Sequence, residues 1–171
     1  ALREREGFIK ITGEVGTGKT LLCRLLLNEL ERNAHTAYIP NPHLTPGALY
    51  ETVAEEFGVD VARCANTHQI FKALNKRLIV LVTDQRRAVL VIDEAQAMPE
   101  ETSEAMRLLT NLETESTRLL QVVLFGQPEL DKLLQRQSLR QLQQRIIFQY
   151  HLAPLDQASV AQYLRHRLAQ A

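Results

Sequence analysis

The residues best suited to chemistry lie in an eight-residue run near the start of the chain. Residues 13–20 read Gly-Glu-Val-Gly-Thr-Gly-Lys-Thr, which matches the phosphate-binding pattern GxxxxGK[ST]. Glycines allow the backbone to turn tightly and bring its N–H groups close to a phosphate. The lysine would contact the β- and γ-phosphates, and the threonine would offer its hydroxyl to Mg²⁺. The predicted nucleotide-binding residues are Gly13, Glu14, Val15, Gly16, Thr17, Gly18, Lys19, Thr20 and Leu21.

Two acidic residues follow a continuously apolar run later in the chain. Asp93 and Glu94 come directly after residues 88–92, which read Ala-Val-Leu-Val-Ile. A carboxylate at the carboxyl end of a buried parallel strand lies where such sheets bind ligands. We expect Asp93 to hold Mg²⁺, directly or through water, and Glu94 to activate or orient an attacking water. The alternative interpretation is that the two carboxylates cap the next helix.

Two other polar residues follow predicted strands. Gln127 would lie between the glycine-rich loop and the acidic pair, where it would hydrogen-bond a γ-phosphate or the attacking water. The alternative for Gln127 is a polar residue in a turn. Asn41 would reach Glu94 and hold it away from the water until a partner binds; an Asn-Pro turn is the alternative.

Arginines in the stretch 139–146 are candidates for a role between subunits. An arginine supplied by a neighbour is a common way to speed nucleotide hydrolysis. This stretch precedes the last predicted strand, so its arginines would point away from their own site and toward the next subunit of a ring. Arg145 is the first choice and Arg140 the second, and a solvated or ion-paired surface arginine is the alternative for each.

Alternating β-prone and helical segments must position these residues, and they predict an α/β fold with a parallel sheet covered by helices. The predicted strands are residues 8–12, 36–40, 88–92, 120–125 and 146–152, ordered 5-1-4-3-2 across the sheet. The predicted helices are residues 19–33, 46–57, 67–84, 99–113 and 156–169, with short helices near Pro128 and Leu139.

Length and composition narrow the function classes. The 171 residues are enough for one domain with a real core, with room for the start of a second. Twenty basic residues balance twenty acidic ones, so the net charge does not demand nucleic acid or an anionic membrane. The two cysteines lack metal-ligand spacing, which indicates a reducing compartment. No apolar run approaches the length needed to span a bilayer.

Together these motifs resemble the AAA+ ATPases within the P-loop NTPase class. Residues 11–20, 91–96, 108–114, 125–130 and 139–146 are similar to the ExeA/GspA group of general secretion pathway ATPases, which includes MshM of the MSHA pilus system. The blocks Asn-Leu-Glu-Thr, Gly-Gln-Pro-Glu-Leu and Leu-Arg-Gln-Leu-Gln-Gln-Arg narrow the resemblance. Transposition ATPases of the TniB kind share parts of this signature.

The resemblance implies an ATPase that uses ATP and Mg²⁺ and helps to assemble a secretin channel or a type IV pilus. It places the domain on the cytoplasmic face of a bacterial inner membrane, with membrane contact only through segments outside these residues. It further implies self-association in the ATP-bound form, an ATPase core over residues 1–154, and the beginning of a helical lid over residues 155–171. No DNA partner is expected. The alternatives are a DNA-linked ATPase of the TniB kind and a nucleotide-gated switch with little turnover.

Overall fold

The fold is built on a five-stranded parallel sheet. The computed structural model describes residues 7–112 and 118–169. The strands are β1 (Phe8–Gly13), β2 (Ala34–Ile39), β3 (Arg87–Ile92), β4 (Leu120–Gly126) and β5 (Ile146–Leu152). They pair in parallel in the order β2-β3-β4-β1-β5. Read from the other edge this is 5-1-4-3-2, so the predicted α/β fold and strand order are confirmed.

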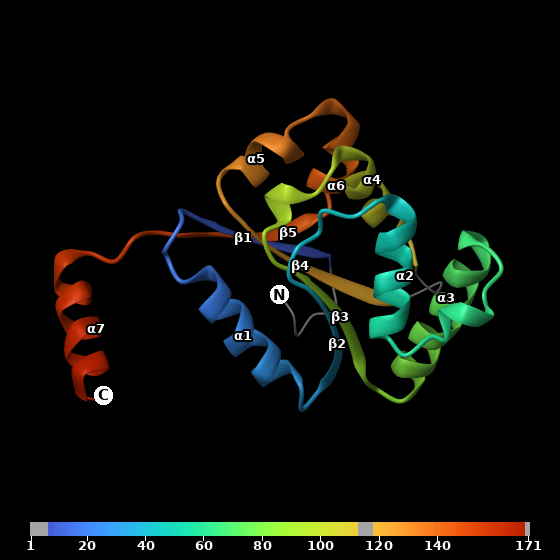
Figure 1. The fold of residues 1–171 in the computed structure, drawn as a ribbon, viewed down its shortest axis with the longest axis horizontal. Helices are drawn as coiled ribbons and strands as arrows, with labels where there is room; N and C mark the ends of the chain where they lie inside the picture. Colours follow the sequence, from blue (N-terminus) through green and yellow to red (C-terminus); the bar gives the residue numbers. More distant parts are fainter. Residues whose placement is uncertain (1–6, 113–117, 170–171) are drawn as a thin grey trace.

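Helices cover both faces of the sheet (Figure 1). The helices are α1 (Lys19–Leu30), α2 (Pro46–Glu56), α3 (Thr67–Thr83), α4 (Glu100–Leu109), α5 (Glu129–Leu134), α6 (Arg140–Gln143) and α7 (Gln157–Ala169). The 3₁₀ turns are η2 (Val61–Arg63), η3 (Ala95–Ala97) and η4 (Gln137–Leu139).

Alternate side chains of β3 lie on opposite faces of the sheet, so the strand contributes to the core on both faces. Its alternate residues Leu90 and Ile92 pack with side chains of α2 to α6, whereas Val89 and Val91 pack with Cys23 and the rest of the inner stripe of α1. The four β3 side chains are fully buried, as expected for a central parallel strand that is apolar along its whole length. The carboxyl ends of the strands are therefore rigidly placed beside one another.

Local signals account for the helix starts. Thr45 caps α2 by accepting a hydrogen bond from the N–H of Ala48, and Pro46 occupies the first turn. Asn66 caps α3 in the same way, accepting from the N–H of Gln69. Both caps are side-chain oxygens that satisfy a backbone donor with no partner inside the helix.

Several predicted boundaries move by a few residues. The second strand begins at Ala34 rather than residue 36, because Ala34 and His35 pair with Arg87 and Ala88 of β3. The first helix ends at Leu30 rather than residue 33. The fourth long helix ends at Leu109, and residue 113, its predicted end, lies outside the described residues.

The last helix, α7, stands apart from the sheet at the end of an extended segment that leaves β5 (Figure 1). Its described side chains are mostly exposed. Within the described ranges, no helix combines the length and the apolar character that crossing a bilayer requires.

Candidate active site

The glycine-rich loop joins β1 to α1 and turns through two left-handed residues. Gly16 has φ +82° and Gly18 has φ +89°, a region that residues with a Cβ rarely adopt. Helix α1 begins immediately afterwards at Lys19. The loop therefore brings backbone donors and the positive end of a twelve-residue helix to the carboxyl edge of the sheet.

Lys19 is buried under this loop. Its Nζ donates to the carbonyl oxygens of Gly13 and Glu14, each at 2.8 Å. Thr17 also donates its hydroxyl to the Glu14 carbonyl, at 2.8 Å. The loop thus folds around its own lysine and holds the ammonium group where a phosphate on the loop would meet it.

Two oxygen donors predicted to hold Mg²⁺ lie side by side. The Thr20 hydroxyl donates to Asp93 Oδ2 at 3.1 Å, across from α1 to the end of β3. Among the residues that the structure describes, no group of three or more His, Cys, Asp or Glu side chains could hold a metal. Hydroxyl and carboxylate oxygens in so small a set fit Mg²⁺, which keeps several waters and binds substrate phosphates.

Glu94 and Gln127 line the same cavity as the glycine-rich loop. This open cavity has a volume of about 290 Å³, close to the lower end of the range of small-molecule sites. Gln127 Nε2 donates to Glu94 Oε2 at 3.3 Å. The lining residues are Val15, Gly16, Gly18, Lys19, Thr20, Leu21, Glu94 and Gln127.

A residue that the sequence reasoning did not select, Gln96, joins these two. Its Nε2 donates to Glu94 Oε2 at 2.5 Å, and its Oε1 accepts from the backbone N–H of Gln127 at 2.9 Å. The only sequence signal was its place two residues after Glu94, which does not by itself predict the contact. Glu94 itself adopts a left-handed conformation with φ +50°.

Asn41 takes part in a local turn. Its Oδ1 accepts a hydrogen bond from the backbone N–H of His43 at 3.2 Å. This is the Asn-Pro turn that was the alternative interpretation of the residue. Among the described residues, the side-chain hydrogen bonds to Glu94 come from Gln96 and Gln127 and not from Asn41.

Arg145 lies at the opposite edge of the sheet, just before β5 begins. Its Nη1 donates to the carbonyl oxygen and to the hydroxyl of Thr110, at 3.1 and 3.0 Å. Thr110 follows the last residue of α4, so the guanidinium lies at the negative end of that helix. Arg140 is exposed at the start of α6. Neither arginine lines the cavity of its own glycine-rich loop.

Burial and the charge of Asp93 raise the pKa values of two side chains near the site. Cys23 is fully buried on the inner face of α1, and burial together with the negative charge of Asp93 raises its pKa to about 12. Burial is likewise the main cause that raises the pKa of Tyr38 above its usual value, followed by the charges of Cys23 and Asp93. The Cys23 thiol is therefore a packing group and not a nucleophile.

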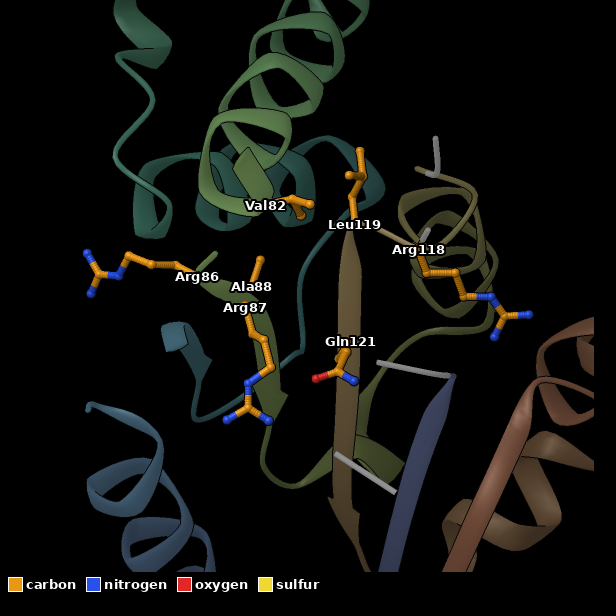
Figure 2. A pocket seen from close by; sticks show the side chains of 7 residues that line it. All are labelled: Val82, Arg86, Arg87, Ala88, Arg118, Leu119 and Gln121. Carbon is orange, nitrogen blue, oxygen red and sulfur yellow. The ribbon is translucent and has the colours of Figure 1, made fainter. Parts of the chain in front are cut away.

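A second, much smaller cavity of about 10 Å³ lies at the amino edge of the sheet (Figure 2). Three arginines contribute to its lining, but their guanidinium groups point in different directions and do not converge on one point (Figure 2). These residues are Arg86, Arg87 and Arg118. A single anion would not contact all three, so this cavity lacks the convergence seen at the carboxyl edge.

Comparison with known proteins places this geometry in a family. The model of a family described as "AAA domain" matches residues 2–134. The chain is 44% identical over 170 residues to General secretion pathway protein A of Aeromonas hydrophila, covering 99% of this chain and 31% of that protein. The chain thus spans about a third of the length of this relative.

Solved structures share the fold at low identity. The ORC1 protein of Aeropyrum pernix, solved in complex with DNA, matches with a TM-score of 0.72 and 22% identity, over 96% of this chain and 44% of that one. The ORC2 protein of the same organism, solved with ADPNP and ADP, matches with a TM-score of 0.70 and 17% identity, over 95% and 45%. At these identities the likeness shows the fold alone.

Proposed function

This chain belongs to the AAA domain family, and we propose that it binds Mg-ATP and hydrolyses it in the cavity at the carboxyl edge of its sheet. The observation that carries the proposal is convergence. A phosphate-binding loop, a hydroxyl–carboxylate pair suited to Mg²⁺, and a second carboxylate with an amide partner all meet around one cavity. The similarity to General secretion pathway protein A supports the same conclusion.

Each residue of the cavity has a proposed role. The loop amides and Lys19 bind the phosphates of ATP, and Thr20 with Asp93 would hold Mg²⁺, which neutralises phosphate charge when bound. Glu94 accepts a proton from the attacking water, and Gln127 hydrogen-bonds the γ-phosphate. Catalysis then rests mainly on positioning and charge stabilisation.

The finer proposals concern what ATP turnover is used for. We propose that Arg145 acts on the site of a neighbouring copy, so that hydrolysis is slow in isolated chains and faster in a dimer or ring. The energy would be coupled to assembly of a bacterial envelope machine, a secretin channel or an MSHA-type pilus, at the cytoplasmic side of the inner membrane. Residues 1–154 would form the ATPase core and residues 155–171 the beginning of a lid, in keeping with the separate position of α7 in Figure 1.

The test is ATP turnover as a function of protein concentration, with and without Mg²⁺. Glu94→Gln should bind ATP normally and lose about 10²- to 10⁴-fold in kcat, the usual contribution of a general base. Lys19→Ala should weaken ATP binding itself. Wild-type turnover in the Glu94→Gln variant would remove Glu94 from its proposed role.

Two outcomes would redirect the proposal. ATP binding without turnover at any protein concentration would favour a nucleotide-gated switch. Steeply salt-dependent DNA binding would favour a DNA-linked ATPase, because displaced counterions make phosphate contacts sensitive to salt.

A further inference from the structure

The side chain of Gln96 connects two groups that the proposed function uses separately. One end donates to Glu94 Oε2 at 2.5 Å, and the other accepts from the backbone N–H of Gln127 at 2.9 Å. Gln127 Nε2 also donates to the same oxygen of Glu94, at 3.3 Å. The three residues therefore form a closed loop of hydrogen bonds beside the phosphate-binding cavity.

The chemistry of the partners determines which way the Gln96 amide faces. An ionised carboxylate only accepts hydrogen bonds, and a backbone N–H only donates them. The NH₂ group of Gln96 must therefore face Glu94, and its carbonyl oxygen must face Gln127. A side chain that can only donate or only accept would satisfy one of these contacts and lose the other.

Two backbone features make room for this bridge. Glu94 has φ +50° and ψ +38°, a left-handed conformation that is uncommon for a residue with a side chain. It leads directly into η3, which carries Gln96 back over the end of β4. There, a Cβ on Gly126 would lie only 3.0 Å from Gln96 Oε1, so the glycine allows the amide to approach. Backbone strain of this kind clusters at functional sites.

We propose that Gln96 is a positioning residue that couples the γ-phosphate contact at Gln127 to the orientation of Glu94. This inference rests on the proposed function, because it needs Glu94 as the base and Gln127 as the phosphate contact. When Gln127 moves to meet a γ-phosphate, its N–H carries the Gln96 amide with it, and the other end of that amide turns the Glu94 carboxylate. The state of the nucleotide thereby sets whether the base faces the water.

Two substitutions at Gln96 separate the two ends of the bridge. Gln96→Met has similar length but loses both hydrogen bonds. Gln96→Glu keeps an acceptor for the Gln127 N–H, but it loses the donor and puts a second negative charge beside Glu94. A matched control is Gln69→Met, which removes a glutamine that accepts from the N–H of Ala65 at the start of α3, away from the cavity.

The first readout is ATP hydrolysis, separated into kcat and KM. Both Gln96 variants should lose about 10- to 100-fold in kcat, the scale of effect expected when a reacting group is misplaced. ATP affinity and KM should stay at the wild-type value, because Gln96 does not line the phosphate cavity. Gln69→Met should match the wild type. Unchanged kcat in both Gln96 variants would overturn the proposal.

The second readout does not depend on turnover. Hydrogen exchange at the backbone N–H of Gln127 should be faster in Gln96→Met, which removes its acceptor, and unchanged in Gln96→Glu, which retains it. An equal exchange rate in Gln96→Met and the wild type would overturn the bridge. If the wild type binds ATP but never hydrolyses it, the proposed base role fails, and the exchange rates alone then decide whether Gln96 links the two strand ends.

Discussion

The two edges of the sheet place polar residues in opposite ways. At the carboxyl edge, Thr20 donates to Asp93 and Gln127 donates to Glu94, and Thr20, Glu94 and Gln127 line one cavity. At the amino edge, the arginines around the smaller cavity point apart (Figure 2). Convergent groups can bind one substrate together, whereas these divergent guanidinium groups do not meet at a single anion.

The amino edge would nevertheless contribute to catalysis if chains associate. Arg145→Ala should lower kcat by about 10³-fold at high protein concentration, the lower end of what a transition-state arginine from a neighbour contributes. ATP affinity should not change, because Arg145 does not line its own cavity. Turnover is measured across a range of protein concentrations, where the wild type alone should show rising specific activity.

The control for this prediction is Arg140→Ala, the second candidate in the same stretch. A loss of turnover in Arg140→Ala with normal turnover in Arg145→Ala would transfer the role to Arg140. Full turnover in both variants would leave the amino edge without a catalytic role.

The sequence signals that place the glycine-rich loop and the acidic pair at the carboxyl edge are local, whereas the roles of these residues stay predictions. The loop pattern and the apolar run before Asp93 are contiguous, and the strand order brings them together without further information. The role of Gln96 depends instead on the left-handed backbone at Glu94, which the residue type at that position does not predict. The position of Arg145 depends on Thr110, the residue after the end of α4 and thirty-five residues earlier in the chain, and helix ends are the least well determined part of a sequence prediction.

A side chain added to a glycine of the loop at the carboxyl edge should strain the backbone, whereas one added to a helical glycine should not. Gly18→Ala forces a Cβ into φ +89° and should cost about 1–2 kcal/mol in the free energy of unfolding. Gly47→Ala is the matched control: it lies in α2, where an added Cβ would meet nothing within 4 Å. That change should stabilise the protein by about 0.4–1 kcal/mol. Urea unfolding measures both, and equal effects of the two variants would contradict the assignment of strain to the loop.

At the amino edge, stability should depend instead on the hydrogen bonds that Thr110 makes at the end of α4. Thr110 donates its hydroxyl to the carbonyl of Arg107 at 2.7 Å, which leaves its lone pairs to accept from Arg145. Thr110→Val keeps the shape but loses both bonds, and it should cost about 1 kcal/mol in the free energy of unfolding. ATP affinity should be unaffected, since the change lies at the other edge. Thr110→Ser, which keeps the hydroxyl, should restore most of the stability; if serine is as destabilising as valine, the hydroxyl is not the cause.

The smallest expected effect is a difference in alkylation between the two cysteines, one packed between α1 and the sheet and the other remote from the cavity. Cys23 is fully buried on the inner face of α1, with its pKa raised to about 12 by burial and by the charge of Asp93, whereas Cys64 is half-buried after η2. At pH 8 only about one Cys23 in ten thousand would be a thiolate, even if the reagent could reach it. Iodoacetamide should therefore modify Cys64 in the folded protein and reach Cys23 only after unfolding in urea, as peptide mass spectrometry would show. Rapid modification of Cys23 in the folded state would mean that α1 separates from the sheet, and the carboxyl edge would then be less rigid than its hydrogen bonds indicate.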